Sequence, residues 1–342
     1  MNRLVVFRFS AMGDVVLLLP VLTGLLSDNK ELEVYLVTRR SFFPFFKDIE
    51  RLHLIEADLR GEHEGITGLF RLFKHIRQDV KPTQVVDVHS VLRTFILDFF
   101  FRLAGFKPVR FNKGRREKKK ILRTRKFKIL PTAVERYAAA FHKSGYKFDL
   151  PTPPVFKNIV PIDISQLNAG EILAGISPFA KHSQKVWGLD KVEELIALAN
   201  QHYKITFILF GGGQDELILL NDMAQKIPNC IVAANYFGLE EEISLFHRLN
   251  IMISMDSANM HMASMAGVPT ISIWGATHPV FGFTAYKQPV ENIIQYEGDA
   301  IKCRPCSVFG NKPCIYHEIK CMKLIPAEAV FNRMREILSQ SN

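Results

Sequence analysis

The segment IMISMDSANMHMASMAGVPTISI, residues 251–273, contains two short apolar runs on either side of a helical stretch. The two runs, at 251–254 and 270–273, are rich in isoleucine and other apolar side chains, which favour buried strands. Gly267 and Pro269 end the helix between them and return the chain to a strand. A strand, a helix and a second strand in this order predict a βαβ unit of a parallel sheet.

The same alternation extends along most of the chain. We expect further strands at 4–9, 33–38, 84–87, 174–177, 204–210 and 230–233, with helical patterns between them. Apolar strands separated by helices indicate parallel sheets covered on both faces. Four prolines in residues 151–161 disfavour both helix and central strand, so this segment is the best candidate for a linker.

These patterns predict an α/β protein with two doubly wound, Rossmann-like domains that face each other across a cleft. We expect an N-terminal domain at 1–155, a C-terminal domain at 156–325 and a final helix within 326–342, which begins soon after Pro326. In such sheets, ligands bind outside the carboxyl ends of the strands.

Composition and hydropathy exclude a disordered chain and a membrane-spanning one. Apolar residues make up 48% and charged residues 23% of the 342 residues, which is a globular balance. The apolar stretch at 15–26 is interrupted by Pro20 and Thr23 and is too short to cross a bilayer. It also reads poorly as a signal peptide, because Asp14 stands at its edge and no small-residue cleavage site follows. We therefore expect a soluble, cytoplasmic protein.

The net charge of +10 is concentrated in one block. Residues 107–128 contain twelve Lys or Arg and a single acid, Glu117, so the surplus of eleven accounts for the whole net charge. Such a block indicates a polyanionic partner, which can be nucleic acid, anionic lipid or a phosphorylated glycan, or else a solvated loop. Its central basic residues are Lys113, Arg115, Arg116, Lys118, Lys119 and Lys120.

Four of the five cysteines lie in a short C-terminal segment with the spacing Cys303-x2-Cys306-x7-Cys314-x6-Cys321. The first pair has the spacing of zinc ligands, but the second pair does not repeat it. A zinc site and a reduced structural cluster are therefore both consistent with this pattern.

The opening segment also predicts an anion site. Asp256 or Ser257 can cap the helix that follows, and the unpaired amides of the first turn, with the helix dipole, suit a diphosphate. His261 follows Ser257 by four residues and so lies on the same helix face. The alternative is an ordinary strand–helix–strand unit with a hydrogen-bonded histidine.

Three more loops follow predicted strands. In SAMGD, residues 10–14, Asp14 can serve as a general base or can cap the next helix. In SPFAKHSQKVW, residues 177–187, Lys181, Ser183 and Lys185 can bind phosphate oxygens or lie in a solvated loop. The run FGGGQDE, residues 210–216, lacks a full GxGxxG pattern and does not indicate a dinucleotide dehydrogenase. Its acids, Asp215 and Glu216, can meet ribose hydroxyls or occupy a first helical turn.

Together these segments resemble glycosyltransferase family 9, the ADP-heptose:lipopolysaccharide heptosyltransferases and their relatives, over essentially the whole chain. The resemblance rests on S-x-M-G-D and the helix after it at 10–20, on S-x-K-x-W at 183–187, and on D-S-x-x-x-H-x-A-x-x-x-G-x-P at 256–269. The cysteine-rich stretch that ends in Cys321-Met322 also recurs in relatives.

The resemblance implies a GT-B fold and an inverting single displacement that requires no metal or other cofactor. It assigns Asp14 as the base that deprotonates the acceptor hydroxyl. The donor-binding residues that it implies are Ser183, Lys185, Asp256, Ser257, Ala258 and His261. Two features depart from the family: Ala258 stands where many relatives have glycine, and the ribose-binding acid does not align cleanly with Asp215 or Glu216.

The family's default donor is ADP-heptose, and its acceptors are acidic lipopolysaccharide or lipooligosaccharide cores. We therefore expect a monomer that contacts the cytoplasmic face of the inner membrane through the basic block and binds no nucleic acid. Two alternatives stand beside this interpretation. One is a nucleic-acid or membrane-binding module that works through the basic block, and the other is a sugar-nucleotide epimerase or a non-catalytic relative with the same fold.

Overall fold

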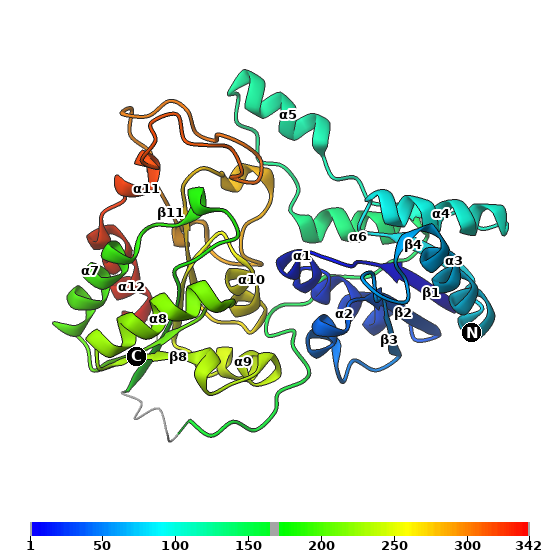
Figure 1. The fold of residues 1–342 in the computed structure, drawn as a ribbon, viewed down its shortest axis with the longest axis horizontal. Helices are drawn as coiled ribbons and strands as arrows, with labels where there is room; N and C mark the ends of the chain where they lie inside the picture. Colours follow the sequence, from blue (N-terminus) through cyan, green and yellow to red (C-terminus); the bar gives the residue numbers. More distant parts are fainter. Residues whose placement is uncertain (1, 165–170, 341–342) are drawn as a thin grey trace. The chain divides into compact units, whose positions relative to one another are not determined.

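The computed structural model describes residues 2–164 and 171–340, which form an α/β protein with two wholly parallel sheets (Figure 1). The chain divides by its contacts into two units. The first contains Met1–Arg115 and Pro131–Asn158, and the second contains Arg116–Leu130 and Ile159–Asn342. The predicted α/β class with doubly wound parallel sheets is therefore confirmed.

The first unit is built on a five-stranded sheet with the order β3-β2-β1-β4-β5. Its strands are β1 (Asn2–Phe7), β2 (Leu32–Thr38), β3 (Leu52–Glu56), β4 (Gln84–Asp87) and β5 (Val109–Arg110). Its helices are α1 (Met12–Val16), α2 (Leu19–Asp28), α3 (Gly65–His75), α4 (Leu92–Leu103) and α6 (Ala133–Lys143), with a 3-10 helix at Arg40–Phe46 and a π-helical turn at Ile76–Val80. The strand order changes direction between β1 and β4, which is where doubly wound sheets bind ligands.

The second unit is built on a six-stranded sheet with the order β11-β10-β9-β6-β7-β8. Its strands are β6 (Ile172–Ser177), β7 (Ile205–Leu209), β8 (Cys230–Val232), β9 (Ile251–Met255), β10 (Thr270–Trp274) and β11 (Ile293–Gln295). Its helices are α7 (Leu189–Asn200), α8 (Gln214–Lys226), α9 (Leu239–Phe246), α10 (Ala258–Met265), α11 (Lys320–Lys323) and α12 (Ala327–Ser339). Here the order changes direction between β6 and β9.

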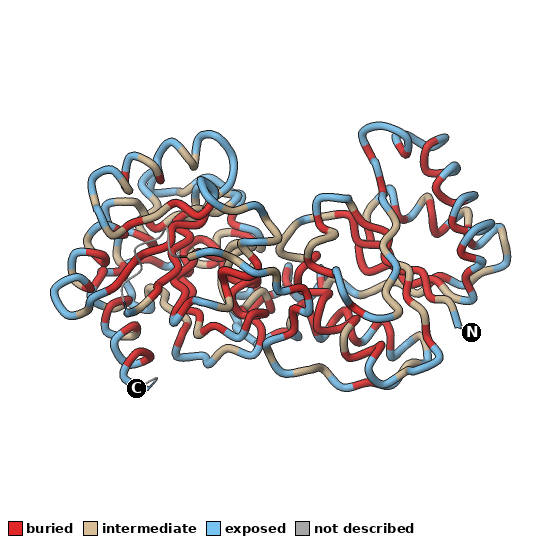
Figure 2. Tube along the Cα trace, turned by 90° about the horizontal axis from the view of Figure 1, so that it is seen from below, coloured by how far each residue is buried: buried red, intermediate tan, exposed pale blue. Residues whose placement is uncertain are grey.

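Buried segments are concentrated inside each unit (Figure 2), and the strands that are buried from end to end belong to the second unit. Every residue of β7, β9 and β10 is buried. A strand covered on both faces needs apolar side chains at successive positions rather than at alternate ones, which explains the continuous apolar runs in the sequence. In the first unit, α3 and α4 pack on the face that carries Val5 and Phe7.

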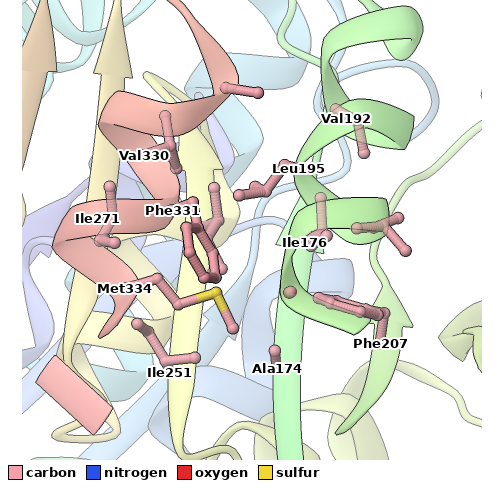
Figure 3. Packing of buried hydrophobic residues seen from close by; sticks show 14 of the residues in the cluster. Ala174, Ile176, Val192, Leu195, Phe207, Ile251, Ile271, Val330, Phe331 and Met334 are labelled. Atoms are coloured by element: carbon pink, nitrogen blue, oxygen red, sulfur yellow. The ribbon is translucent and has the colours of Figure 1, made fainter. Parts of the chain in front are cut away.

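The C-terminal helix belongs to the core of the second unit. Figure 3 shows side chains of α7 and α12 meeting those of the strands, with Phe331 and Met334 beside Ile251 and Ile271. The indole of Trp187 donates a hydrogen bond to the carbonyl of Ile325, 3.0 Å away, and so fixes the loop that leads into α12. The helix begins directly after Pro326, as the sequence predicts.

Most of the basic block folds against the second unit. Residues Arg115–Thr124 form helix α5, and Ile121 and Leu130 are buried with Val280 and Phe281. The Leu130 amide donates to the Val280 carbonyl at 3.0 Å, and the Arg125 guanidinium donates to the Pro305 carbonyl at 2.5 Å. The central part of the block, Arg115–Thr124, is therefore a docked helix and not a free loop.

Among the helices in the described part of the chain, none combines the length and the apolar character needed to cross a bilayer.

Candidate active site

Asp14 lies just past the carboxyl end of β1, inside the first turn of α1. Its Oδ2 is 2.6 Å from Nη2 of Arg8, whose side chain is only 4% exposed, whereas that of Asp14 is 38% exposed. The same guanidinium donates to the Val88 carbonyl at 2.6 Å. Arg8 is therefore buried and fixed by a backbone carbonyl, and it holds the partly exposed carboxylate of Asp14 near the carboxyl end of β1. The N-cap of α1 is Ala11, so Asp14 does not cap this helix.

Tyr137 supports the same arrangement from α6. Its ring lies under the Arg8 guanidinium, 5.4 Å from ring centroid to Cζ, and its hydroxyl donates to the Asp14 carbonyl at 3.4 Å. Burial raises the pKa of Tyr137 well above its usual range, so this hydroxyl remains a donor at neutral pH. Tyr137 therefore helps to fix both members of the Arg8–Asp14 pair.

The end of β4 brings further polar groups to this edge of the first sheet. Asp87 accepts hydrogen bonds from the amides of His89 and Ser90, each at 2.8 Å. The Ser10 hydroxyl lies 3.5 Å from Nε2 of His89. Burial, followed by the charge of Arg8, lowers the pKa of His89 to about 3, so the imidazole is neutral at physiological pH.

Lys113 adds a second cation to this edge. Burial, followed by repulsion from Arg8, lowers the pKa of Lys113 to about 8, while Asp14 and Asp87 oppose that change. Arg8 and Lys113 thus give the edge a positive character that suits a carboxylate or phosphate. Neither Arg8 nor His89 was singled out from the sequence, although Arg8 directly follows β1 and His89 comes two residues after β4.

The second unit contains a buried ion pair at the carboxyl ends of its central strands. Nζ of Lys185 lies 2.7 Å from Oδ2 of Asp256, and the two side chains are 13% and 8% exposed. The Thr277 hydroxyl donates to the same carboxylate oxygen at 3.0 Å. Lys185 and Asp256 come from the two separate motifs that the sequence assigns to one donor site, and the structure brings them together.

Helix α10 points its N-terminus into the same region. Its N-cap, Ser257, makes no side-chain capping bond within the described residues, and its hydroxyl lies 3.1 Å from that of Ser254 instead. The side chain of Asn259 donates to the Ser177 hydroxyl at 2.8 Å and ties the first turn to the end of β6. The amides of this first turn, which begins at Ala258, are therefore suited to an anion. His261 is buried on the same helix.

A glycine in the cysteine-rich loop completes this cluster. Gly310 has a φ of +72°, and a Cβ built on it would lie 3.0 Å from both Cγ and Cε of Lys185 and 3.2 Å from Cγ2 of Thr277. The loop backbone therefore packs directly on the stem of Lys185, and only glycine fits there without displacement. The sequence gives no signal for this role of Gly310.

A family model described as glycosyltransferase family 9 (heptosyltransferase) matches residues 99–312, which is more than half of the chain. The chain belongs to glycosyltransferase family 9. It is therefore a glycosyltransferase, as the resemblance of its motifs predicted.

Individual relatives of this family 9 glycosyltransferase are distant in sequence, and the share of the chain that they match differs from one to another. The chain is 22% identical over 323 residues to the lipopolysaccharide core heptosyltransferase OpsX of Haemophilus influenzae, covering 88% of this chain and 86% of that protein. It is 27% identical over 172 residues to lipopolysaccharide heptosyltransferase 3 of Escherichia coli K12, covering 48% and 46%. The chain thus spans most of the first relative and about half of the second.

Solved structures of similar fold cover nearly all of this chain. Escherichia coli heptosyltransferase WaaC, solved with ADP, has a TM-score of 0.71 at 21% identity, covering 98% of this chain and 99% of that one. A family 9 glycosyltransferase from Veillonella parvula has a TM-score of 0.76 at 19% identity, covering 99% and 98%. These similarities confirm the predicted GT-B fold.

The remaining residues that the sequence assigns to donor or ribose binding lie in two turns of the second unit. Ser183 is exposed in the 3-10 turn Ser183–Lys185. Glu216 accepts a hydrogen bond from the Gly212 amide at 2.8 Å in the first turn of α8 and so stabilises its own loop. Asp215 is exposed in the same turn.

The predicted basic residues differ in exposure. Arg115, Arg116, Lys119 and Lys120 are exposed. Lys118 is buried, with its ammonium 4.0 Å from the centroid of the Phe283 ring. This cation–π contact helps to dock α5 on the second unit. Lys118 therefore does not share the solvent-facing position of its neighbours.

The cysteines of the family 9 enzyme are free thiols. Cys321 is buried, and Cys303, Cys306 and Cys314 are partly buried. Burial, followed by the neighbouring Cys303, raises the pKa of Cys306 to about 12. In the described part of the chain, no group of three or more His, Cys, Asp or Glu side chains is arranged to hold a metal ion. The zinc alternative gains no support from this geometry.

Proposed function

We propose that this family 9 glycosyltransferase moves a heptose from ADP-heptose to an acidic core sugar of lipopolysaccharide or lipooligosaccharide, with inversion at the anomeric carbon. The observation that carries this proposal is the Lys185–Asp256 pair beside the uncapped N-terminus of α10. The family description and the names of the relatives, which are lipopolysaccharide heptosyltransferases, support the choice of sugar and acceptor.

The donor's diphosphate binds at the start of α10 in this proposal. The amides that follow Ser257 donate to its oxygens, and the helix dipole favours its charge. Lys185 contacts the phosphate and the sugar, and Asp256 accepts hydrogen bonds from sugar hydroxyls. As the bond to the anomeric carbon breaks, the departing diphosphate gains charge, and these preorganised donors stabilise it without a divalent cation. Each such donor is typically worth about 10²–10³ in rate.

Asp14 acts as the general base. It takes the proton from the acceptor hydroxyl while that oxygen forms its bond to the anomeric carbon and ADP leaves with the electron pair of the broken bond. Arg8 holds the carboxylate in place, as the 2.6 Å ion pair indicates. A positioned base typically contributes about 10²–10⁴ in rate. Lys113 and Arg8 attract the acidic groups of the acceptor core.

The acceptor's lipid anchor places the reaction at the cytoplasmic face of the inner membrane in this proposal. The exposed cations of α5, which include Arg116, Lys119 and Lys120, steer the enzyme to the anionic leaflet. Such residues contribute about 1 kcal/mol each near a charged surface. Replacing these three by alanine is expected to weaken liposome binding and to leave donor binding unchanged, and unchanged liposome binding would count against this role.

Calorimetry against a panel of sugar nucleotides, with EDTA present, tests the donor assignment. Binding of ADP-heptose in EDTA, followed by a mass-identified heptosylated core product, is the expected result. Selective binding of a different sugar nucleotide would replace ADP-heptose as the donor. An altered sugar nucleotide without any glycosylated product would instead indicate the epimerase alternative.

A further inference from the structure

Helix α4 carries an apolar stripe on the face that points away from the core. Leu92, Phe95, Phe99 and Leu103 are 73%, 36%, 55% and 72% exposed. At 100° per residue, these four positions fall within an arc of about 80°, so they form one continuous line. The line runs about 16 Å along the helix at 1.5 Å per residue. A surface helix normally presents polar side chains on this face.

The opposite face of α4 already provides the packing that the fold needs. Thr94, Leu97, Asp98 and Phe101 are fully buried, and Leu97 and Phe101 belong to the core cluster of the first unit. The exposed stripe is therefore not required to hold the helix in place. Its apolar character calls for a separate explanation.

Helix α3 extends the stripe into a patch. Ile66 and Phe70 are 65% and 40% exposed. The rings of Phe70 and Phe100 meet edge to face at 5.2 Å, and Phe99 lies 6.1 Å from Phe100, so the two helices form one surface. We call this surface the α3–α4 face, made of Ile66, Phe70, Leu92, Phe95, Phe99 and Leu103.

Cations border the α3–α4 face. Arg93 and Arg102 are exposed and fall on the two sides of the apolar arc. Lys74 lies 5.0 Å from the Phe70 ring centroid, and Arg110 lies 4.4 Å from that of Phe95. The single acid in the sequence of α4, Asp98, is fully buried and bound to Arg110. The fully described helix α4 therefore presents no exposed carboxylate.

We infer that the α3–α4 face inserts into the surface of an anionic lipid bilayer. An apolar stripe flanked by cations is the arrangement of helices that lie in a membrane interface, where apolar side chains enter the acyl boundary and basic groups reach lipid phosphates. A symmetric contact with a second copy of this chain would place the same patch on both partners. That contact would oppose arginine to arginine without an exposed acid on α4 to neutralise them.

Bilayer binding by this face does not require the proposed transfer reaction, so the two are tested separately. The full chain is mixed with vesicles of phosphatidylglycerol and phosphatidylethanolamine, or of phosphatidylcholine alone, and the bound fraction is measured by flotation. The variant Phe99→Asn/Leu103→Asn is compared with Ile218→Asn/Leu219→Asn, which replaces two exposed apolar residues of α8 that are 61% and 44% exposed. Donor binding by calorimetry and thermal unfolding are followed in parallel.

We expect the α4 variant to lose at least tenfold in affinity for the anionic vesicles, and the α8 variant to bind like the parent. Both variants should keep donor affinity. Anionic-vesicle binding that is unchanged in the α4 variant would overturn the inference. The inference would also be overturned if the parent protein did not bind vesicles and instead formed a concentration-dependent dimer that the α4 substitutions abolish.

A single-residue probe keeps the inference testable if the double variant unfolds. Both native tryptophans, Trp187 and Trp274, are buried at 3% and 0% exposure, so their emission forms a constant background. Phe99→Trp adds one fluorophore to the α3–α4 face. A blue shift with anionic vesicles and quenching by brominated lipids are expected, whereas emission that vesicles leave unchanged would contradict insertion.

Discussion

Nζ of Lys185 and Oδ2 of Asp256 form a 2.7 Å ion pair that is almost entirely removed from solvent, although the two residues are far apart in the sequence. Truncating one partner of a buried pair leaves the other charge uncompensated, which typically costs about 3–5 kcal/mol. We expect Lys185→Met to lower the melting temperature and to weaken donor binding by at least tenfold in calorimetry. Lys181→Met removes an exposed cation of the same loop and is the matched control. Equal losses in both variants would contradict a specific role for the pair.

Asp14→Asn is expected to lower the rate of the transfer reaction without changing the affinity for the donor. The amide keeps the shape of the carboxylate but accepts no proton, so kcat should fall by about 10²–10⁴. Donor affinity should not change, because the donor-site residues belong to the other unit. Asp48→Asn, at an exposed position of the first unit, is the control and should retain full activity. Loss of donor binding in Asp14→Asn would argue against the role of a base.

The contact of Gly310 with Lys185 can be tested by adding one methyl group. Gly310→Ala brings a Cβ to 3.0 Å from the lysine stem at a φ of +72°, so we expect at least a tenfold loss of donor affinity. Backbone strain alone costs about 1–2 kcal/mol at such a position. Gly105→Ala imposes that strain at a φ of +91° with nothing within 4 Å. The Gly105→Ala control should lose stability only. An equal loss of donor affinity in both variants would show that the contact between Gly310 and Lys185 does not affect donor binding.

Lys113 predicts a pH dependence for acceptor binding. Burial and then repulsion from Arg8 lower its pKa to about 8, so the ammonium is charged below that pH and neutral above it. The KM for an acidic acceptor should therefore rise as pH increases through 8. Lys113→Arg stays charged and should abolish the rise, whereas Lys113→Met should show the high KM throughout. If the KM rose equally in the parent, Lys113→Arg and Lys113→Met, a group other than Lys113 would be responsible for the pH dependence.

Buried strands were predicted well because their sequence signal is local. The expected strands at 251–254 and 270–273 correspond to β9 (Ile251–Met255) and β10 (Thr270–Trp274), and the helix between them to α10. The edge strands β3, β5 and β11 were not predicted. They are short or partly exposed, so they lack the continuous apolar run that double-sided burial demands.

The sequence singles out candidate residues of the site but not the contacts between them. Asp14, Lys185 and Asp256 stand in motifs at strand ends, where ligands are expected. The roles of Arg8, Thr277 and Gly310 arise from tertiary contacts. Arg8 forms an ion pair with Asp14, Thr277 donates a hydrogen bond to Asp256, and the backbone of Gly310 packs against the side chain of Lys185. A single sequence gives no measure of such distances. The docking of α5 depends likewise on Ile121 meeting Val280 and Phe281, far along the chain.

Arg116–Leu130 belongs to the second unit although it lies in the sequence between two segments of the first unit, and this affects any attempt to express the two units separately. The chain passes from one unit to the other after Arg115, after Leu130 and again after Asn158, so neither unit is one uninterrupted stretch of polypeptide. A fragment starting at residue 159 would lack Ile121 and Leu130 and would leave Val280 and Phe281 uncovered and prone to aggregate. Dissection of this enzyme therefore has to supply residues 116–130 to the C-terminal fragment, for example by circular permutation.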